Sequence, residues 1–287
     1  MYTLSNGNQF PLIGLGTYLI RGSDTIKKVI DAGLDAGYRS IDTAAVYGNE
    51  EEIGNALIEL LPKYNLTRSD IYITSKLAPH DQGKNKAKNA ALSSIEKLKT
   101  TYIDLYLIHW PGAEGVDVKS NLNSKLRRES WFELTELYNK GFIKNLGVSN
   151  YTTDHLKELL ADCNGVVPVV NQVEYHPLYK QLDLIEFCNN EKILLQAYSS
   201  LGGARKTNLL LKNSVVLDIS KKINKSSAQV LLKWALQHGF AIIPKSVNPE
   251  RIRENIDLNF ELSNEDIQLL DSIKANEKFS WDPNVVK

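Results

Sequence analysis

The chain has 287 residues, 43% of them hydrophobic and 24% charged, which is typical of a globular protein long enough to bury a substantial core. Its 34 basic and 34 acidic side chains cancel, so no net field attracts nucleic acid or an anionic membrane, and a bound anion would need a local basic cluster. Two cysteines, Cys163 and Cys188, are too few for a zinc site made of cysteine alone, and neither a signal-peptide pattern nor an apolar stretch of ~18 residues is found.

The chain opens with a segment, Thr3–Pro11, that predicts a small hairpin because an Asn6-Gly7 turn stands in its middle. Behind it, short apolar runs alternate with longer amphipathic segments. The runs lack the polar alternation of a half-exposed strand, which favours parallel strands that are covered on both faces. Strands are therefore expected over residues 12–15, 38–41, 71–74, 103–108, 143–148, 169–173, 193–197 and 241–243.

Helical periodicity fills the intervals between these runs. Helices are expected over residues 24–36, 86–98, 128–139, 153–160 and 182–189. Capping signals mark three further starts: Asn49 ahead of three glutamates, Ser226 with Gln229 at the spacing of a capping box, and Ser263 ahead of a last helix that reaches Ile273. Eight strand–helix units favour a (β/α)8 barrel as one domain over residues 1–287, with the hairpin outside it and an extra C-terminal helix.

Each predicted strand from the second onward ends in a polar or aromatic residue that a strand does not need. These residues are Asp42, Lys76, His109, Ser149, Gln172, Tyr198 and Lys245. In a β/α barrel the carboxyl ends of the strands meet on one face, where the active sites of such barrels lie. Packing could account for one such residue, but not for seven at equivalent strand ends. We therefore expect a functional site on that face.

Four ionisable residues belong to three successive strand ends: Asp42, Tyr47 in the loop that follows it, Lys76 and His109. Adjacent strands lie about 4.8 Å apart, so these side chains can touch. A lysine ammonium ~4 Å from a tyrosine hydroxyl favours the phenolate by up to ~4 kcal/mol, which predicts a Tyr47 pKa lowered from ~10 towards ~7 and a proton donor that works near neutral pH. Asp42 supplies the counter-charge that a buried lysine needs, and His109 is suited to polarise a carbonyl oxygen.

The sequence strongly resembles the aldo-keto reductase family over essentially its whole length. The matching stretches occur in order at residues 14–17 (GLGT), 38–44 (YRSIDTA), 47–50 (YGNE), 73–76 (ITSK), 103–111 (IDLYLIHWP), 147–150 (GVSN), 171–177 (NQVEYHP), 198–202 (YSSLG), 243–246 (IPKS) and 281–283 (WDP). The resemblance implies a (β/α)8 barrel that reduces aldehydes and ketones to alcohols by hydride transfer from NADPH, an alcohol dehydrogenase (NADP+) of the aldehyde reductase type. It implies Tyr47 as the proton donor, tuned by Lys76 and Asp42. It also implies His109 as the group that orients the carbonyl.

The same resemblance implies which residues hold the cofactor. They are Gly16, Thr17, Tyr18, Asp42, Ser149, Asn150, Gln172, Tyr198, Ser199, Leu201, Lys245, Ser246, Val247, Arg251, Glu254 and Asn255. From the residues alone, Lys245, Ser246 and Arg251 form a basic cluster that suits a phosphate group, and Pro249 suits the first position of a helix that begins between Lys245 and Arg251. The resemblance makes this group the 2′-phosphate of NADPH. Substrate contacts are implied for Tyr18, Tyr47, His109 and Trp110.

Other interpretations fit the residues less well. A non-catalytic NADPH-binding barrel, acting as an accessory or structural protein, need not keep all four ionisable groups, and a phosphate-binding isomerase barrel would not need the Tyr-Lys-Asp arrangement. The pair Gly14 and Gly16 lacks the third glycine of a Rossmann fingerprint. Tyr18, Ala78 and Ser200 depart from residues common in the family at the substrate entrance, so the sequence does not identify the carbonyl substrate. We expect a cytoplasmic monomer that binds no metal, nucleic acid or membrane.

Overall fold

Parallel strands lie at the centre of the computed structural model, which describes residues 1–203 and 207–287. Within these residues eight strands pair in chain order, each with the next: β3 (Leu15–Gly16), β4 (Ser40–Asp42), β5 (Tyr72–Leu77), β6 (Leu105–Ile108), β7 (Leu146–Ser149), β8 (Val170–Glu174), β9 (Leu194–Tyr198) and β10 (Ala241–Ile242). The sheet closes because Ile13 bridges Ile242 in parallel and the amide of Gly16 donates to Pro244 O at 3.0 Å. The eight predicted strands are thus confirmed as a barrel, with ends shifted by a few residues.

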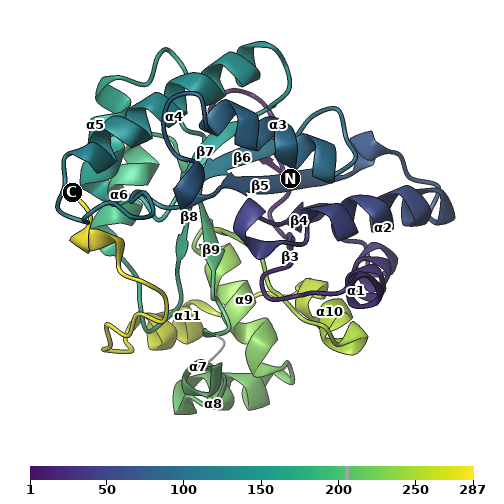
Figure 1. Ribbon diagram of the computed structural model, residues 1–287. Coiled ribbons are helices and arrows are strands. Elements are labelled where there is room, and N and C mark those ends of the chain that lie inside the picture. The colour runs from purple at the N-terminus through teal and green to yellow at the C-terminus, as the bar shows by residue number, and fades with distance from the viewer. Residues whose placement is uncertain (204–206) are drawn as a thin grey trace.

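Helices surround this barrel (Figure 1). Those that follow strands are α1 (Ser23–Asp35), α2 (Glu50–Lys63), α3 (Ala87–Lys97), α4 (Leu122–Asn139), α5 (Thr153–Ala161), α6 (Leu182–Asn190), α7 (Thr207–Leu211), α8 (Ser214–Ile223), α9 (Ser227–Gln237), α10 (Pro249–Ile256) and α11 (Asn264–Asp271). The structure adds α7 and α8 to the predicted set, and α4 begins six residues before the predicted start at Arg128. No helix in the described ranges is long and apolar enough to cross a membrane.

The predicted hairpin covers the amino-terminal end of the barrel. Its strands β1 (Tyr2–Thr3) and β2 (Gln9–Phe10) pair antiparallel, with Tyr2 opposite Phe10. Phe10 is fully buried and packs with strand residues such as Leu105 and Leu107 inside the barrel. Because this end is filled by side chains, access to the strand ends remains on the opposite face.

Two of the three capping predictions are confirmed. The Ser226 hydroxyl accepts from the Gln229 amide at 3.2 Å and the Gln229 side chain accepts from the Ser226 amide at 3.1 Å, while Ser263 accepts from an amide of α11. For Asn49 the predicted helix start is confirmed, because α2 begins at Glu50, but the expected side-chain cap is absent. The Asn49 side chain turns into the barrel face, where Nδ2 donates to the carbonyls of Thr17 and Ile20 at 3.0 Å, so it braces the loop after β3 instead of capping α2.

Candidate active site

The four ionisable residues lie together at the carboxyl end of the strands. Asp42 is the last residue of β4, Lys76 stands one residue before the end of β5, and His109 directly follows β6. Tyr47 closes a turn of 3-10 helix, Ala45–Tyr47, in the loop after β4. The Nζ atom of Lys76 lies 2.6 Å from Asp42 Oδ1 and 3.3 Å from the Tyr47 hydroxyl oxygen. The structure therefore brings these side chains into direct contact.

The Lys76 ammonium is fully buried, and every donor it has is used. Besides Asp42 and Tyr47, it donates to the carbonyl of Thr43 at 2.8 Å. Burial lowers the pKa of Lys76, and the neighbouring Asp42 carboxylate opposes that shift. A buried charge is tolerated only with such pairing, so Lys76 and Asp42 form one unit.

The pKa of Tyr47 differs from the expectation. We expected the lysine to lower it, but burial, and next the charge of Asp42, hold the pKa of Tyr47 well above its usual value. The lysine does not offset these two effects, because its ammonium lies closer to the Asp42 carboxylate, at 2.6 Å, than to the Tyr47 hydroxyl, at 3.3 Å. Tyr47 therefore stays protonated near neutral pH.

His109 is a neutral imidazole in this setting. Burial, and next the positive charge of Lys76, hold the pKa of His109 well below its usual value. Its Nδ1 atom is buried and has no hydrogen-bond partner among the described residues. The ring centroid lies 5.7 Å from that of Tyr47, with the planes at 72°. A neutral imidazole keeps one N–H donor, which can serve a carbonyl oxygen placed between the two rings.

Aromatic rings frame this pair on the solvent side. The rings of Tyr18 and Tyr47 lie 5.0 Å apart, and Trp110 stacks on His109 with centroids 6.2 Å apart. Trp281, from the C-terminal segment, meets Trp110 edge-on at 5.0 Å. We call these five rings the substrate mouth. Tyr18 and Trp281 are 55% and 46% exposed, so the mouth opens to solvent with apolar walls.

Polar side chains at the next strand ends form a connected cradle. The hydroxyl of Ser149, which ends β7, donates to the carbonyl of Gln172 at 2.8 Å. Asn150, whose backbone φ is 63°, donates from Nδ2 to the carbonyl of His109 at 3.0 Å. The hydroxyl of Tyr198, the last residue of β9, donates to Asn150 Oδ1 at 2.6 Å. The cradle is therefore tied to the backbone that carries His109.

Gln172 links the cradle to the ionisable group. Its Nε2 atom donates to Asp42 Oδ2 at 2.7 Å and to Gln196 Oε1 at 2.8 Å. Because both partners are acceptors, they bind the amino group of the Gln172 side chain. Its carbonyl oxygen therefore points away from Asp42 and Gln196. Gln172 lies two residues before the end of β8 at Glu174, not at the strand tip. Sequence reasoning missed Gln196, although a glutamine inside an apolar run was a usable signal.

The basic cluster follows β10, the strand next to β9. Lys245 and Arg251 are exposed, and neither forms an ion pair with any residue that the structure describes. Pro249 starts α10, as predicted, and Asn248 caps it by accepting from the amides of Glu250 and Arg251. Asn248 was not predicted, although its side chain sets how α10 begins. Lys245 and Arg251, both exposed and close to the N-terminus of α10, suit a phosphate group.

The other residues expected at a cofactor border the same face. A Cβ atom on Gly16 would come within 2.7 Å of Ile243 O, so only glycine fits beside the strand that leads to Lys245. Thr17 donates from its hydroxyl to the carbonyl of Asp42 at 2.8 Å. The remaining positions follow β9 or flank and enter α10: Ser199, Leu201, Ser246, Val247, Glu254 and Asn255.

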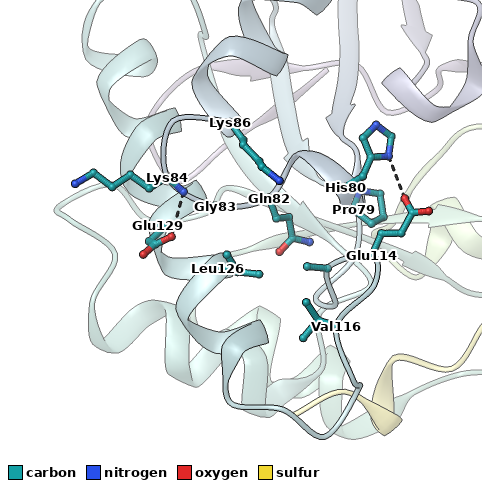
Figure 2. Close-up of a pocket in the computed structure, with 11 residues that line it drawn as sticks. Pro79, His80, Gln82, Gly83, Lys84, Lys86, Glu114, Val116, Leu126 and Glu129 are labelled. Atoms are coloured by element: carbon teal, nitrogen blue, oxygen red, sulfur yellow. Dashed lines mark hydrogen bonds and ion pairs between the residues drawn. The ribbon is translucent and has the colours of Figure 1, made fainter.

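A separate cavity of about 220 Å³ lies between the loops that follow β5 and β6 (Figure 2). Pro79, His80 and Glu114 line one side of it, and Gln82 lies between them and Leu126 in this view. Gln82 Nε2 donates to the carbonyl of Trp110 at 2.8 Å, so the cavity lies behind the wall of the substrate mouth. Its lining includes none of the four ionisable residues, and we therefore place the reaction in the mouth and not here.

Comparison with known proteins gives a consistent result. The model of the aldo/keto reductase family matches residues 12–275. Glyoxal reductase of Bacillus subtilis (strain 168) is 40% identical over 282 residues, which cover 98% of this chain and 95% of that protein. Aldose reductase C of Dictyostelium discoideum is 40% identical over 290 residues, which cover 96% and 89%. The crystal structure of an aldo-keto reductase enzyme from a Medee basin deep-sea metagenome library superposes with a TM-score of 0.90 at 35% identity and covers all of both chains.

Proposed function

The chain belongs to the aldo/keto reductase family, and we propose that it reduces aldehydes with NADPH, using Tyr47 as the proton donor. Carbonyl reduction with a nicotinamide cofactor is the activity of the family. The preference for NADPH and the aldehyde reductase type are the further steps of the proposal. The observation that carries it is the buried Lys76 ammonium held between the Asp42 carboxylate and the Tyr47 hydroxyl.

The residues of the cradle fit a nicotinamide cofactor. Gln172 can present its side-chain carbonyl oxygen, and Ser149 its hydroxyl oxygen, to the amino group of a carboxamide. Tyr198 offers a ring face against which a flat base can stack. Lys245 and Arg251 are exposed and form no ion pair with the residues that the structure describes, so both can pair with a 2′-phosphate, which NADH lacks. Gly16 lets β3 pack against the backbone of Ile243, just before Lys245, where any side chain would collide. When bound, the cofactor supplies the hydride.

The chain's own residues supply the proton and the positive field. The neutral imidazole of His109 donates to the carbonyl oxygen and orients it towards Tyr47. Tyr47 is protonated because its pKa is raised, so it carries the proton that the new alcohol needs. When that proton leaves, the Lys76 ammonium at 3.3 Å stabilises the tyrosinate that remains. In this account Lys76 acts on the product of proton transfer and not by ionising Tyr47 beforehand.

The test is a turnover measurement with the purified protein. NADPH or NADH is mixed with short, aromatic and dicarbonyl aldehydes, and the loss of reduced-nicotinamide absorbance is followed. We expect turnover with NADPH and a large loss in Tyr47→Phe. A protein that binds NADPH but reduces no aldehyde of the panel would contradict the proposal and favour the non-catalytic alternative.

We also propose that the chain works as a monomer of one barrel domain in the cytoplasm. Free thiols at Cys163 and Cys188 suit a reducing compartment. The support for one domain is that residues 278–287 pack back onto elements from the middle of the chain, such as Glu174 and Arg127. Light scattering coupled to size exclusion tests the monomer.

A further inference from the structure

The C-terminal segment is held to the barrel at two places, with one ring of the substrate mouth between them. We call residues Lys278–Val286 the strap. In Figure 1 this yellow segment runs from α11 towards the chain end near α5 and α6. At its far end, the carbonyl of Val286 lies 3.1 Å from His155 Nε2 of α5, and Arg127 of α4 donates to the carbonyl of Lys287 at 3.0 Å. Trp281 lies between the two attachments.

The near attachment is a buried carboxylate. Glu174 ends β8, and its side chain is completely buried. Oε1 accepts from the amide of Phe279 at 2.5 Å and from His176 Nε2 at 3.0 Å. Oε2 accepts from the amide of Ser280 at 3.0 Å and from Lys278 Nζ at 3.2 Å. Three of these four donors belong to the strap, so one side chain binds three consecutive residues of it.

The surroundings make this attachment specific for a carboxylate. Burial alone would raise the pKa of Glu174. The hydrogen bond from His176, the positive charge of Lys278 and the hydrogen bonds from the strap amides outweigh burial and lower that pKa to about 2. The His176 ring stacks on Phe279 with centroids 4.5 Å apart. Hydrogen bonds to a charged acceptor contribute about 1.5–3 kcal/mol each, which is about ten- to a hundredfold in an equilibrium constant.

Trp281 follows immediately after the three residues that Glu174 binds. Its ring meets Trp110, which stacks on His109. The backbone that leads into Trp281 is thus bonded to the Glu174 carboxylate, while its ring contacts Trp110.

We propose that Glu174 is a positioning residue that holds Trp281 in the wall of the substrate mouth and thereby sets how well bulky carbonyl compounds bind. This role rests on the proposed carbonyl reduction. A two- or three-carbon aldehyde held at His109 does not reach Trp281, because the Trp110 ring lies between them. A bulky aromatic aldehyde extends along the mouth and contacts the wall.

The decisive variant is Glu174→Gln, with Glu186→Gln as the matched control. The glutamine keeps the shape but turns an amino group towards strap donors, whereas Glu186 is an exposed residue of α6. We expect Glu174→Gln to raise KM for a bulky aromatic aldehyde about ten- to a hundredfold. The kcat for a short aldehyde should stay near wild type. Glu186→Gln should change neither value.

A second measurement does not depend on turnover. Trp131 and Trp234 are fully buried, so acrylamide quenches the fluorescence of Trp110 and Trp281. Trp281 is 46% exposed, and release of the strap should roughly double its quenching. This readout keeps the two proposals distinguishable: if wild type reduced no aldehyde, the proposed function would fail, while the quenching would still decide whether Glu174 holds the strap.

A double-mutant cycle with Trp281→Ala completes the test. If Glu174 acts through Trp281, the two changes in KM for the bulky aldehyde should not add. Additive effects, equal losses for short and bulky aldehydes, or unchanged quenching would overturn the proposal. If Glu174→Gln fails to fold, Lys278→Met removes one strap donor instead, and the same shifts are expected at smaller size. No shift in Lys278→Met would then count against the role of Glu174.

Discussion

Gln172 Nε2 lies 2.7 Å from Asp42 Oδ2, so the carboxylate that neutralises Lys76 also orients an amide of the cofactor cradle. The two oxygens of Asp42 thus face the proton-donating group on one side and the cradle on the other. A change at Asp42 should consequently affect both proton transfer and cofactor binding, which is the basis of the first prediction.

Asp42→Asn should weaken cofactor binding as well as turnover. If the asparagine oxygen stays on Lys76, its amino group faces the amino group of Gln172, and two donors cannot bond. Gln172 can relieve this only by flipping its amide, which turns its carbonyl oxygen away from the cofactor. The substitution also leaves the buried Lys76 without its counter-charge, which lowers the free energy of unfolding by about 3–5 kcal/mol. Fluorescence titration with NADPH and urea unfolding measure the two effects, with the exposed Asp24→Asn as control. Cofactor affinity equal to wild type would show that Asp42 does not orient Gln172.

Tyr47→Phe should retain NADPH binding and lose most turnover. The phenylalanine keeps the ring against Tyr18 and His109 but has no proton to give. General acid catalysis contributes ~10²–10⁴-fold, and the loss should appear in kcat. Retention of more than about a tenth of the wild-type kcat would mean that another group is the acid.

Lys76→Met should move the alkaline limb of the pH–rate profile upward. The pKa of Tyr47 is already raised, and reduction is lost as pH rises through that pKa because the donor ionises. The ammonium favours the tyrosinate, so its removal raises the pKa further while slowing proton transfer near neutral pH, where the tyrosinate that remains is no longer stabilised. Steady-state kcat against pH tests this. A limb that stays in place would argue that Lys76 does not act on Tyr47.

The loss of folding stability at acid pH should depend on Glu174. Its folded pKa of about 2 lies below the ordinary 4.5, so its contribution is present above about pH 4.5 and is lost as pH falls towards 2. Linkage puts that contribution at up to about 3 kcal/mol. Urea unfolding of wild type and Glu174→Gln should therefore differ most at neutral pH and converge at low pH. A difference that is constant with pH would show that the carboxylate charge is not what stabilises the strap.

Arg251→Ala should weaken NADPH about ten- to a hundredfold and leave NADH nearly unchanged, since one charged hydrogen bond contributes ~1.5–3 kcal/mol. The effect should shrink at high salt because the site is exposed. Arg253→Ala is a close control: it lies on the same helix but pairs with Asp35 at 2.9 Å. Equal losses for both cofactors in Arg251→Ala would assign that residue to the adenine or to the fold, and a loss in Arg253→Ala would point to helix stability.

Sequence reasoning succeeded where the signal is local. The capping box of Ser226 and Gln229 is read from residues three apart, and the structure contains both of its hydrogen bonds. Asn49 carries an equally local signal, yet its amide is recruited by two carbonyls about 30 residues earlier in the chain. A capping rule cannot anticipate that competition, because the competing acceptors come from another loop.

The sequence by itself determined the order of strands and helices and which polar residues stand near the strand ends, because both follow from periodicity and from the parallel arrangement that it requires. Only the tertiary structure decided what those residues touch. Gln172 meets Asp42 across 130 positions, and Glu174 meets Phe279 across 105. It also decided the direction of the Tyr47 pKa, since that depends on how deeply the hydroxyl is buried and on whether the lysine charge is already neutralised by Asp42. Burial and long-range pairing are properties of the closed barrel, and no stretch of the chain contains them alone.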